Sequence, residues 1–485
     1  MEAVEEENIV MEEGAEDFEL TYFNELPEEL VIKVFSYLSP YTDRKIAKLV
    51  NKKWHRLIVV IEHHCNRVFY ESIKSSNIMW KIRKQRSYDI TETLIPGKVK
   101  GRSFRTKVQR ANLNEPHPRF SHSSVILGQY MYVFGGGSSE SNASSTFNDL
   151  YKLDLSNYTW QKVKTKGLLP APRESGTLVS YKQRPSKHLY RAIPYKGKLI
   201  LFGGWCQPPP GAILVGPRFF EDTQIFHVHD SRWQRINVDN NFPTPRAGHG
   251  ASVVGNKMVI FGGSQRNNRL NDVWVFDIDA LSWTCPYIRG QKPRERFGHS
   301  QFTLNDRMIL VIGGCGGPNE LLSDAWLYDV TLCTWIQLNV ENQIYEPPDL
   351  WSHASVLVNG DVVVLSEEKK CPYCRSPIQN FSVPTRKPHG DAKVCSCGRR
   401  NPEDMIMFKQ SCFQMYLLDC SSLLTNSTCR WLNYKYLQPS PPARRMFSVN
   451  LGINEILIFG GLQNVMTQES KTDNHTIVIS AKPSL

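Results

Sequence analysis

A phrase of amino acids repeated six times constrains the fold of this chain more than any other feature. Its clearest copy runs from Pro243 to Trp283 and holds Arg246, then His249, then an apolar run that ends in Gly262-Gly263. An aromatic stretch led by an aspartate follows the glycine pair. A period of roughly 50 residues indicates that one structural unit, too small to bury a core alone, recurs along most of the chain.

The other copies keep the order of these residues. The fixed arginine position holds Arg119, Arg173, Arg246, Arg296, Leu350 and Arg445, each three residues after a proline. Three residues further on stand His122, Gly176, His249, His299, His353 and Ser448. Glycine pairs follow at 135–136, 203–204, 262–263, 313–314 and 460–461, whereas the fifth copy has Leu365-Ser366. The copies close on Trp160, Trp233, Trp283, Trp335 and Trp431.

Each copy predicts four short strands separated by turn residues. In the third copy the expected strands are roughly 250–254, 257–261, 272–277 and 282–286. Runs such as Met258-Val259-Ile260-Phe261 are apolar on both faces, as expected of strands packed between neighbouring sheets. Repeated four-stranded units are typical of a β-propeller. The predicted fold is mainly β, with a six-bladed propeller over residues 116–485.

The glycine pair, the aspartate-led aromatic strand and the spaced tryptophans resemble the Kelch repeat over roughly residues 116–480. This resemblance also implies a six-bladed propeller. The last copy lacks a tryptophan strand after Thr476-Ile477-Val478-Ile479. We predict that the segment around Trp80 supplies this outer strand, which joins the two ends of the ring and removes an exposed sheet edge. The alternative is a linker helix that contains Trp80.

Composition favours a protein of the cell interior. Residues 1–20 carry nine acids and no base, so the net charge of +11 leaves about +20 on the rest of the chain. This acidic start, assigned to a tail over residues 1–22, lacks the basic flank of a signal peptide. No apolar run approaches the roughly 18 residues needed to span a bilayer. We expect cytoplasmic or nuclear residence, no membrane partner, and 12 cysteines that are reduced or bound to metal.

Residues 23–70 predict a small α-helical domain. Leu26-Pro27-x-x-Leu30 and Leu49-Val50-x-x-x-Trp54 lie in two amphipathic segments, and together they resemble the F-box. A bare helical hairpin is the alternative. The resemblance implies that one set of residues forms or supports the face that docks a Skp adaptor: Leu26, Pro27, Leu30, Val34, Leu38 and Trp54. An apolar helical face laid on a partner is an ordinary mode of recognition.

Residues 71–115 are expected to link the two domains. Ten Lys and Arg against two acids lie between residues 81 and 110. Such a stretch is compatible with nucleic-acid binding or nuclear import. Because only two aromatic residues are interleaved with the basic ones, a solvated basic loop is the favoured interpretation and a nucleic-acid partner is not expected.

Strand alternation places the loops that carry the repeated arginines at one face of the propeller, which we call the mouth. A ring formed by Arg119, Arg173, Arg246, Arg296 and Arg445 could bind carboxylates or phosphates of a substrate. The structural alternative is that these side chains bond carbonyl groups of neighbouring blades. The histidines, one per blade, are too dispersed for a metal site and are expected to be packed. The helical domain would enter from the opposite face.

One constellation has the spacing of metal ligands. An insert in the fifth copy, over residues 367–412, holds Cys371, Cys374, Cys395 and Cys397. Four thiolates would complete a closed tetrahedral zinc site with a structural role and no open position for catalysis. His389 or Cys412 could replace one ligand. Exposed free thiols are the alternative.

These features favour a non-catalytic substrate-recognition subunit of a Skp–cullin–F-box ubiquitin ligase. The F-box resemblance implies a Skp adaptor as partner and, through it, a cullin and a RING subunit, while the propeller would hold the protein substrate. No cofactor for catalysis is expected. A propeller scaffold or cytoskeleton-binding protein is the alternative, and an enzyme would need convergent catalytic groups that the sequence does not show.

Overall fold

The computed structural model describes most of the chain in thirteen segments. They are residues 26–83, 93–99, 102–108, 114–139, 145–182, 197–207, 216–237, 241–318, 320–348, 355–367, 412–433, 440–463 and 471–482. Two compact units divide the chain, the first ending at Val68 and the second beginning at Phe69. None of the helices within these segments has the length and apolar character needed to cross a membrane.

The first unit is α-helical. Its helices are α2 (Glu28–Tyr37), α3 (Asp43–Ala47) and the part of α4 (Lys52–Lys74) up to Val68. Helix α2 begins directly after Pro27, a residue suited to a helix start, and its first turn carries two glutamates at the positive end of the helix dipole. Val31 and Phe35 are buried on one side of α2, where the ring of Trp54 meets Phe35 edge-on at 5.0 Å.

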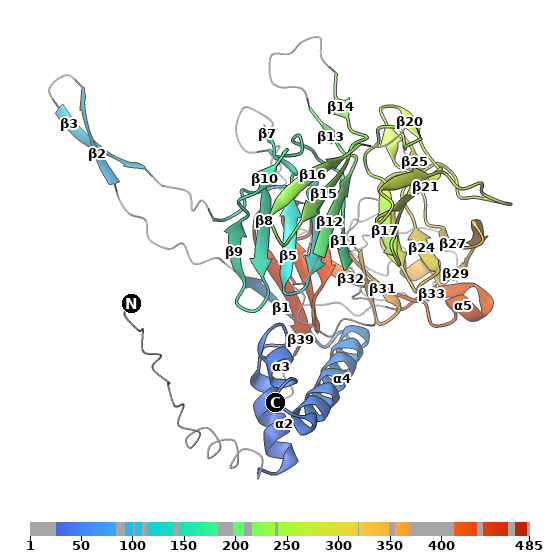
Figure 1. Ribbon diagram of the computed structural model, residues 1–485, viewed down its shortest axis with the longest axis horizontal. Coiled ribbons are helices and arrows are strands. Elements are labelled where there is room, and N and C mark those ends of the chain that lie inside the picture. Colours follow the sequence, from blue (N-terminus) through green and yellow to red (C-terminus); the bar gives the residue numbers. More distant parts are fainter. Residues whose placement is uncertain are drawn as a thin grey trace, which may run out of the picture. The chain divides into compact units, whose positions relative to one another are not determined.

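The second unit is a propeller of six antiparallel blades (Figure 1). The innermost strands are β4 (Ser123–Leu127), β11 (Thr177–Lys182), β17 (Gly250–Val254), β23 (Ser300–Thr303), β30 (Ser355–Val358) and β35 (Ser448–Leu451). The second strands are β5 (Tyr130–Phe134), β12 (Gly197–Phe202), β18 (Lys257–Phe261), β24 (Met308–Ile312), β31 (Asp361–Glu367) and β36 (Glu455–Phe459). Each innermost strand contacts those of both neighbouring blades, which closes the ring.

The outer half of each blade completes the sheet. The third strands are β8 (Leu150–Asp154), β15 (Thr223–His227), β21 (Val273–Asp277), β27 (Ala325–Asp329), β32 (Phe413–Asp419) and β39 (Thr476–Ala481). The outermost strands are β9 (Thr159–Lys162), β16 (Arg232–Ile236), β22 (Ser282–Thr284), β28 (Thr334–Gln337), β33 (Thr428–Trp431) and β1 (Ile78–Arg83). Two short parallel strands extend the blade edges: β10 (Lys166–Gly167) on β16 and β29 (Asn339–Glu341) on β33.

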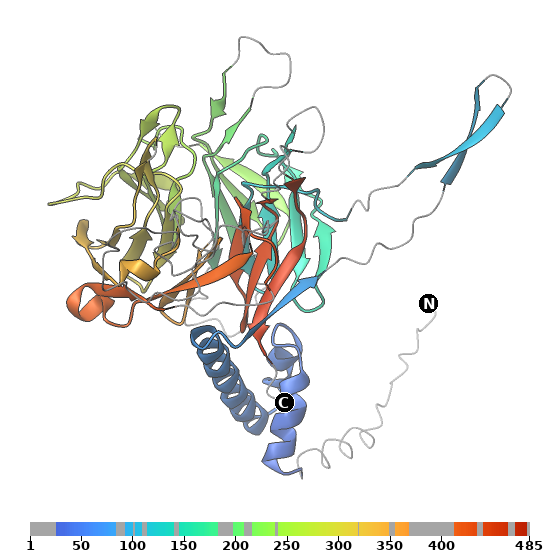
Figure 2. The same cartoon turned by 180° about the vertical axis from the view of Figure 1, so that it is seen from behind.

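Strand β1 closes the sixth blade, as the sequence predicted. It pairs antiparallel with β39 from Ile78–Ala481 to Arg83–Thr476, with Trp80 opposite Ile479. The views in Figures 1 and 2 both show the blue β1 beside the red β39. The Trp80 ring stacks on Phe413 at 5.9 Å, and Phe69, Ile73 and Ile78 join the core of the fifth and sixth blades. The alternative of a linker helix at Trp80 is therefore wrong.

The glycine pairs end the second strands because both residues have left-handed backbone. In the third blade, Gly262 and Gly263 have φ of 64° and 97°. A Cβ on Gly262 would lie 2.6 Å from the carbonyl oxygen of Arg296, so only glycine fits. The fifth blade lacks the pair, and its β31 continues through Leu365 and Ser366 to Glu367.

Short hairpins follow the second strands on the mouth side. They are β6 (Gly137–Ser138) with β7 (Ser145–Thr146), β13 (Trp205–Cys206) with β14 (Arg218–Phe219), β19 (Ser264–Gln265) with β20 (Asn268–Arg269), β25 (Cys315–Gly317) with β26 (Glu320–Leu321), and β37 (Leu462–Gln463) with β38 (Lys471–Thr472). Strand β34 (Arg444–Arg445) also pairs with β37. Figure 1 shows β7, β14 and β20 at the same end of the propeller.

Four further elements lie outside the regular four-stranded blades. The fifth blade carries the short helix α5 (Leu423–Asn426), and the 3-10 turn η1 (Gln343–Tyr345) follows β29. Strands β2 (Thr93–Val99) and β3 (Arg102–Val108) form an antiparallel hairpin. The basic stretch before the propeller is therefore partly a hairpin, and its interpretation as a loop is corrected to that extent.

Candidate functional site

The repeated arginines lie inside the blades, away from solvent. Arg119, Arg173, Arg246 and Arg296 are at most 2% exposed. Each guanidinium donates to an aspartate at the start of the third strand of its own blade; these partners are Asp149, Asp222, Asp272 and Asp324. A ring of free guanidinium groups at the mouth, one of our two interpretations, does not fit this burial.

Arg246 illustrates how completely the guanidinium donors are used. Its Nε donates to the Thr244 carbonyl at 3.1 Å, its Nη1 to the Gly262 carbonyl at 3.1 Å, and both Nη atoms bond Asp272 at 2.7 and 2.8 Å. Burial alone would raise the pKa of Asp272, but the hydrogen bonds and charge of Arg246 outweigh it and hold that pKa below its usual range.

The arginine backbone joins one blade to the next. In the third blade the Arg246 N–H donates to Phe220, and the Arg246 carbonyl accepts from Gly204, both in the second blade. The same pattern recurs at Arg119, Arg173 and Arg296. The structural alternative predicted that the arginine side chains bond carbonyl groups of neighbouring blades. In the structure the arginine backbone makes the hydrogen bonds to the neighbouring blade, whereas the guanidinium group bonds groups of its own blade.

The sixth copy is shifted by one residue relative to our sequence alignment. The buried arginine is Arg444, whose Nη2 lies 2.8 Å from Asp473 and whose Nη1 donates to the Gly460 carbonyl. Arg445, which we had placed in the ring, is 52% exposed and pairs with Glu367. In the first, third and fourth copies the histidine Cβ lies against the second glycine of the pair. In the sixth copy the Cβ of Phe447 lies against Gly461, so Phe447 takes the histidine position. The placement of Arg445 at the repeated arginine position was therefore wrong.

A belt of backbone hydrogen bonds surrounds the mouth two residues after each arginine. The N–H of Ser121 donates to Met446, that of Ser175 to Ser121, that of Gly248 to Ser175, and that of Gly298 to Gly248. All five residues have left-handed backbone, with φ between 50° and 65°. The conformation turns each N–H toward the preceding blade and makes this part of the mouth a fixed frame.

The histidines are packed, as predicted, in the copies that the structure describes, and they lie at blade interfaces. His122, His249 and His299 meet Phe459, Phe202 and Phe261 of the preceding blade edge-on, at 5.2 to 5.3 Å between ring centres. Burial, reinforced by the arginine of the same copy, lowers the pKa of all three, to about 3 for His122 and His299. His353 lies outside the described residues.

This burial predicts a loss of stability in mild acid. Unfolded histidine has a pKa near 6.5, so the unfolded chain binds more protons than the folded one below that pH, and each histidine costs on the order of 2 kcal/mol at pH 5. Glu174 has the opposite effect on stability, because burial raises its pKa to about 7 and the folded chain binds its proton more readily than the unfolded chain. As the pH falls from 7 to 5, this gain offsets the stability lost through about one histidine. The paired aspartates, with lowered pKa, contribute only at more acid pH.

Thermal unfolding measured at pH 7, 6 and 5 checks this prediction. The unfolding temperature of the wild-type chain should fall by several degrees, on the scale of about 1 °C for each kcal/mol in a chain of this length. His299→Gln should reduce the fall and Glu174→Gln should deepen it. Equal unfolding temperatures at pH 7 and 5 in all three chains would contradict the assignment.

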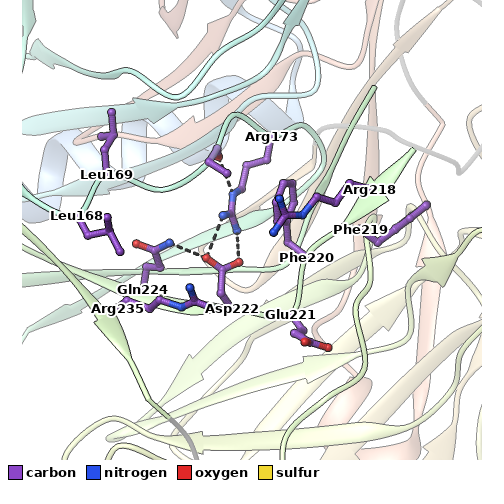
Figure 3. Close-up of a pocket in the computed structure, with 11 residues that line it drawn as sticks. Leu168, Leu169, Arg173, Arg218, Phe219, Phe220, Glu221, Asp222, Gln224 and Arg235 are labelled. Atoms are coloured by element: carbon purple, nitrogen blue, oxygen red, sulfur yellow. Dashed lines mark hydrogen bonds and ion pairs between the residues drawn. The ribbon is translucent and has the colours of Figure 1, made fainter. Parts of the chain in front are cut away.

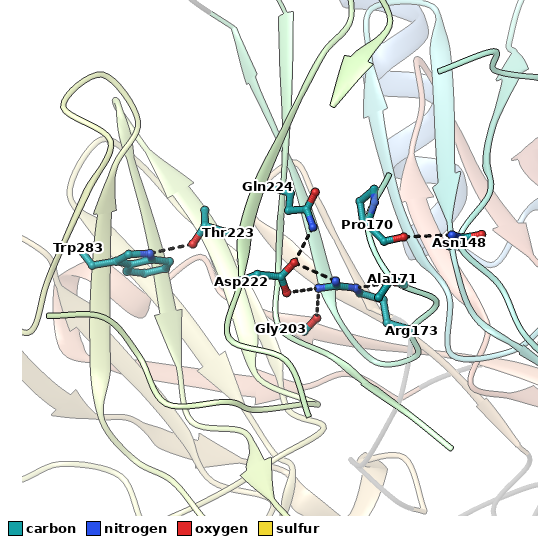
Figure 4. A network of polar contacts seen from close by, with 9 residues as sticks. All are labelled: Asn148, Pro170, Ala171, Arg173, Gly203, Asp222, Thr223, Gln224 and Trp283. Atoms are coloured by element: carbon teal, nitrogen blue, oxygen red, sulfur yellow. Dashed lines mark hydrogen bonds and ion pairs between the residues drawn. The ribbon is translucent and has the colours of Figure 1, made fainter. Parts of the chain in front are cut away.

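A cavity of about 230 Å³ opens over the buried ion pair of the second blade (Figure 3). Arg173 and Asp222 form one wall, with Arg173 Nη1 and Nη2 at 2.8 and 3.0 Å from the carboxylate oxygens (Figure 4). Leu168 and Leu169 lie on one side of this pair and Arg218 on the other. The cavity therefore combines apolar and basic groups.

The internal repeat explains why the cavity exists in this blade. The residue two positions after the paired aspartate is Trp274 in the third blade and Trp326 in the fourth, and each indole N–H donates to that aspartate, at 2.8 and 2.6 Å. In the second blade the residue is Gln224, whose Nε2 donates to Asp222 at 2.5 Å. A glutamine occupies less space than an indole, and its substitution in one copy is a signal that the sequence contained and our reading missed.

A second cavity, also about 230 Å³, is lined by hydroxyl groups of the innermost strands, including Ser124, Ser300, Ser355 and Ser448. These groups already have partners. Ser355 donates to Ser300 at 2.5 Å, Asn450 donates to Ser124 at 2.6 Å, and His122 and Ser448 share a hydrogen bond of 2.7 Å. The cavity is therefore part of the packing between inner strands.

The first unit exposes a contiguous set of apolar side chains on α2. Leu30, Val34 and Tyr37 are 48%, 43% and 80% exposed, and their spacing of four and three residues puts them on one helix face. Of the other predicted docking residues, Pro27 is exposed, whereas Leu26, Leu38 and Trp54 are half-buried against the helical core. The six residues thus divide into three that present the face and three that support it.

Three more exposed apolar residues lie in and after α3. They are Ile46, Leu49 and Val50, of which Leu49 is 85% exposed. The sequence places Leu49 and Val50 in an amphipathic segment, but periodicity alone does not show which apolar side of such a segment is covered. Soluble proteins rarely expose this many apolar side chains over so short a segment without a partner.

The predicted zinc ligands lie outside the described residues. Cys371, Cys374, Cys395 and Cys397 fall within residues 368–411, and the zinc site stays a prediction. Within the segments that the structure describes, no group of three or more His, Cys, Asp or Glu side chains is placed to hold a metal ion.

Comparisons with known proteins found several similar chains. Kelch domain-containing protein 2 of Bos taurus is 29% identical over 260 residues, covering 50% of this chain and 59% of that protein. Acyl-CoA-binding domain-containing protein 5 of Arabidopsis thaliana is 26% identical, covering 56% and 40%. The chain thus spans about half the length of these relatives. A solved structure titled "Structure of YjhT" has a TM-score of 0.49 and 15% identity over 76% of this chain and 96% of that one.

Two family descriptions match separate parts of the chain. "F-box-like" matches residues 23–65, which contain α2 and α3. "FBX42, beta-propeller domain" matches residues 119–335, the first four blades. These matches, on the fold described above, show an F-box/Kelch-type protein close to FBX42.

Proposed function

We propose that this chain is the substrate-recognition subunit of a Skp–cullin–F-box ubiquitin ligase. Its first unit docks a Skp adaptor, and through that adaptor a cullin and a RING subunit. Its propeller binds the protein to be modified. The chain contributes proximity and performs no chemical step: it holds a lysine of the target near the ubiquitin carrier, which raises the effective concentration of the reacting groups.

The observation that carries this proposal is the uncovered apolar face of the first unit. Leu30, Val34 and Tyr37 lie on a different side of α2 from the buried Val31 and Phe35, about a third of a turn away, so the helix is apolar on two sides. One apolar side builds the domain core and the other is available to a partner. A helix face of this kind laid against apolar side chains of an adaptor buries the residues that solvent now meets.

The adaptor complex tests the proposal. Co-expression of the chain with a Skp adaptor should give a one-to-one complex in gel filtration. Leu30→Asp combined with Tyr37→Ala should weaken that complex on the order of 100-fold, because apolar and aromatic anchors carry most of an interface's binding energy. Both residues are well exposed, so the folded chain should tolerate the changes.

A matched control comes from the propeller. Tyr287 is 85% exposed, close to the 80% of Tyr37, and Tyr287→Ala should leave the complex intact. If the folded wild-type chain elutes without the adaptor, the ligase role is refuted and a propeller scaffold becomes the better description.

A further inference from the structure

We propose that the cavity of the second blade is a docking site for an extended protein segment in which acidic and apolar residues alternate. This inference rests on the proposed function, because it names the class of substrate segment that the propeller recognises. The site consists of Leu168, Leu169, Arg218, Arg235 and Gln224 around the Arg173–Asp222 pair (Figure 3). The basic, apolar and amide groups of the site each favour a different feature of the bound segment.

The basic groups of the site are free to bind an anion. Arg218 and Arg235 are exposed, and neither has an ion-pair partner among the described residues. Arg218 lies over the Phe220 ring at 5.1 Å, which holds its planar guanidinium in place. Glu221 is the exposed acid of the site, and Arg173 and Asp222 neutralise each other, so the uncompensated charge is positive. A carboxylate suits the two guanidinium groups.

The apolar wall is uncovered as well. Leu168 and Leu169 are 63% and 42% exposed, and they lie across the cavity from Arg218 (Figure 3). Both precede the buried Arg173, whose backbone is fixed between two blades. An apolar side chain of the bound segment would remove these leucines from water, while the carboxylate beside it meets the arginines.

A buried acceptor without a partner supplies an independent third feature. Gln224 is 3% exposed, its Nε2 donates to Asp222, and its Oε1 has no hydrogen-bond partner. A buried carbonyl oxygen left unbonded costs free energy, so this atom in the cavity wall is available to accept a hydrogen bond from a ligand. The N–H of an extended peptide backbone is such a donor. Charge, apolar surface and backbone recognition therefore converge on one segment of polypeptide.

The test uses the 485-residue chain and defined fluorescein-labelled peptides in fluorescence anisotropy. The probe is Gly-Ser-Asp-Leu-Asp-Leu-Gly-Ser, compared with peptides in which both Asp are Asn or both Leu are Gly. The first peptide should bind, and each replacement should weaken binding about tenfold or more. Affinity should also fall when salt is raised, because exposed charges are screened. Equal binding of the Asp-to-Asn peptide would overturn the proposal.

Two variants locate the binding, and a third is their control. Gln224→Trp copies the residue of the third and fourth blades, keeps a donor to Asp222 and fills the cavity. Arg218→Glu with Arg235→Glu reverses two exposed charges. Each variant should weaken binding of the probe peptide at least about tenfold. Arg266→Glu reverses the charge of one exposed residue in the neighbouring blade and should have less than about a twofold effect.

The outcomes separate this site from the proposed ligase role. Wild-type levels of probe binding in both Gln224→Trp and the double charge reversal would refute the site, as would a wild-type chain that does not bind the probe. An adaptor complex without probe binding refutes the site alone. Probe binding without an adaptor complex supports the site and refutes the ligase role.

Discussion

Replacing Arg246 with methionine should lower the free energy of unfolding by about 3–5 kcal/mol. The change keeps the apolar stem of the side chain but removes donors that now bond Asp272 and the Gly262 carbonyl. Asp272 would then hold a charge in a partly buried place without its counterion, which is the costly state. Chemical denaturation of the wild-type chain and the variant measures the difference.

The sixth copy offers a matched pair of adjacent arginines for the same measurement. Arg444→Met should be strongly destabilising, because Arg444 is buried against Asp473. Arg445→Met should change stability by about 0–1 kcal/mol, since the Arg445–Glu367 pair is half-exposed. Similar effects at both positions would contradict the burial argument and the corrected register.

A double replacement separates the two contributions to this effect. Arg246→Met with Asp272→Leu removes the charge pair as a whole and leaves no unpaired carboxylate. We expect it to recover most of the stability lost in Arg246→Met. A double variant as unstable as the single one would show that the ion pair itself, and not the unpaired charge, matters most.

The sequence predicted the propeller well because the same residue types recur in the same order in its repeated copies. Left-handed glycines at 262–263, a buried strand before them and a tryptophan after them recur at spacings that only a few folds accommodate. The missing outer strand could be located because Trp80 was a tryptophan that no copy used. Because the sixth copy lacks a closing tryptophan and Trp80 lies near the start of the chain, the two ends were predicted to pair.

The candidate sites were less predictable because the sequence does not show what a side chain faces. Arg246 recurs with the repeat, but its partner Asp272 also recurs, and the two together indicate a buried pair. In the sixth copy, Arg444 and Arg445 are neighbours, so spacing alone selected the wrong one. The binding cavity depends on Gln224, a departure from the repeat, whereas repeat analysis directs attention to what is shared.

Removing β1 should prevent the propeller from folding stably. A chain of residues 115–485 would expose the edge of β39, whose Ile477, Val478 and Ile479 are now at most 2% exposed. It would also lose Phe69, Ile73 and Ile78 from the core of the last two blades. Fully burying such a side chain contributes about 1.5–3 kcal/mol. An open edge of apolar strand also templates pairing with other chains.

The appropriate control keeps β1 and discards everything else that precedes the propeller. Residues 69–83, joined by a Gly-Ser linker to residues 115–485, restore the Ile78–Ala481 to Arg83–Thr476 pairing and omit the β2–β3 hairpin. We expect this chain to be monomeric and the shorter one to aggregate or to unfold at a temperature lower by on the order of 10 °C. Light scattering and thermal unfolding distinguish them. Equal behaviour of the two chains would show that five complete blades and an open sixth suffice, and that the joined ends contribute little to the stability of the ring.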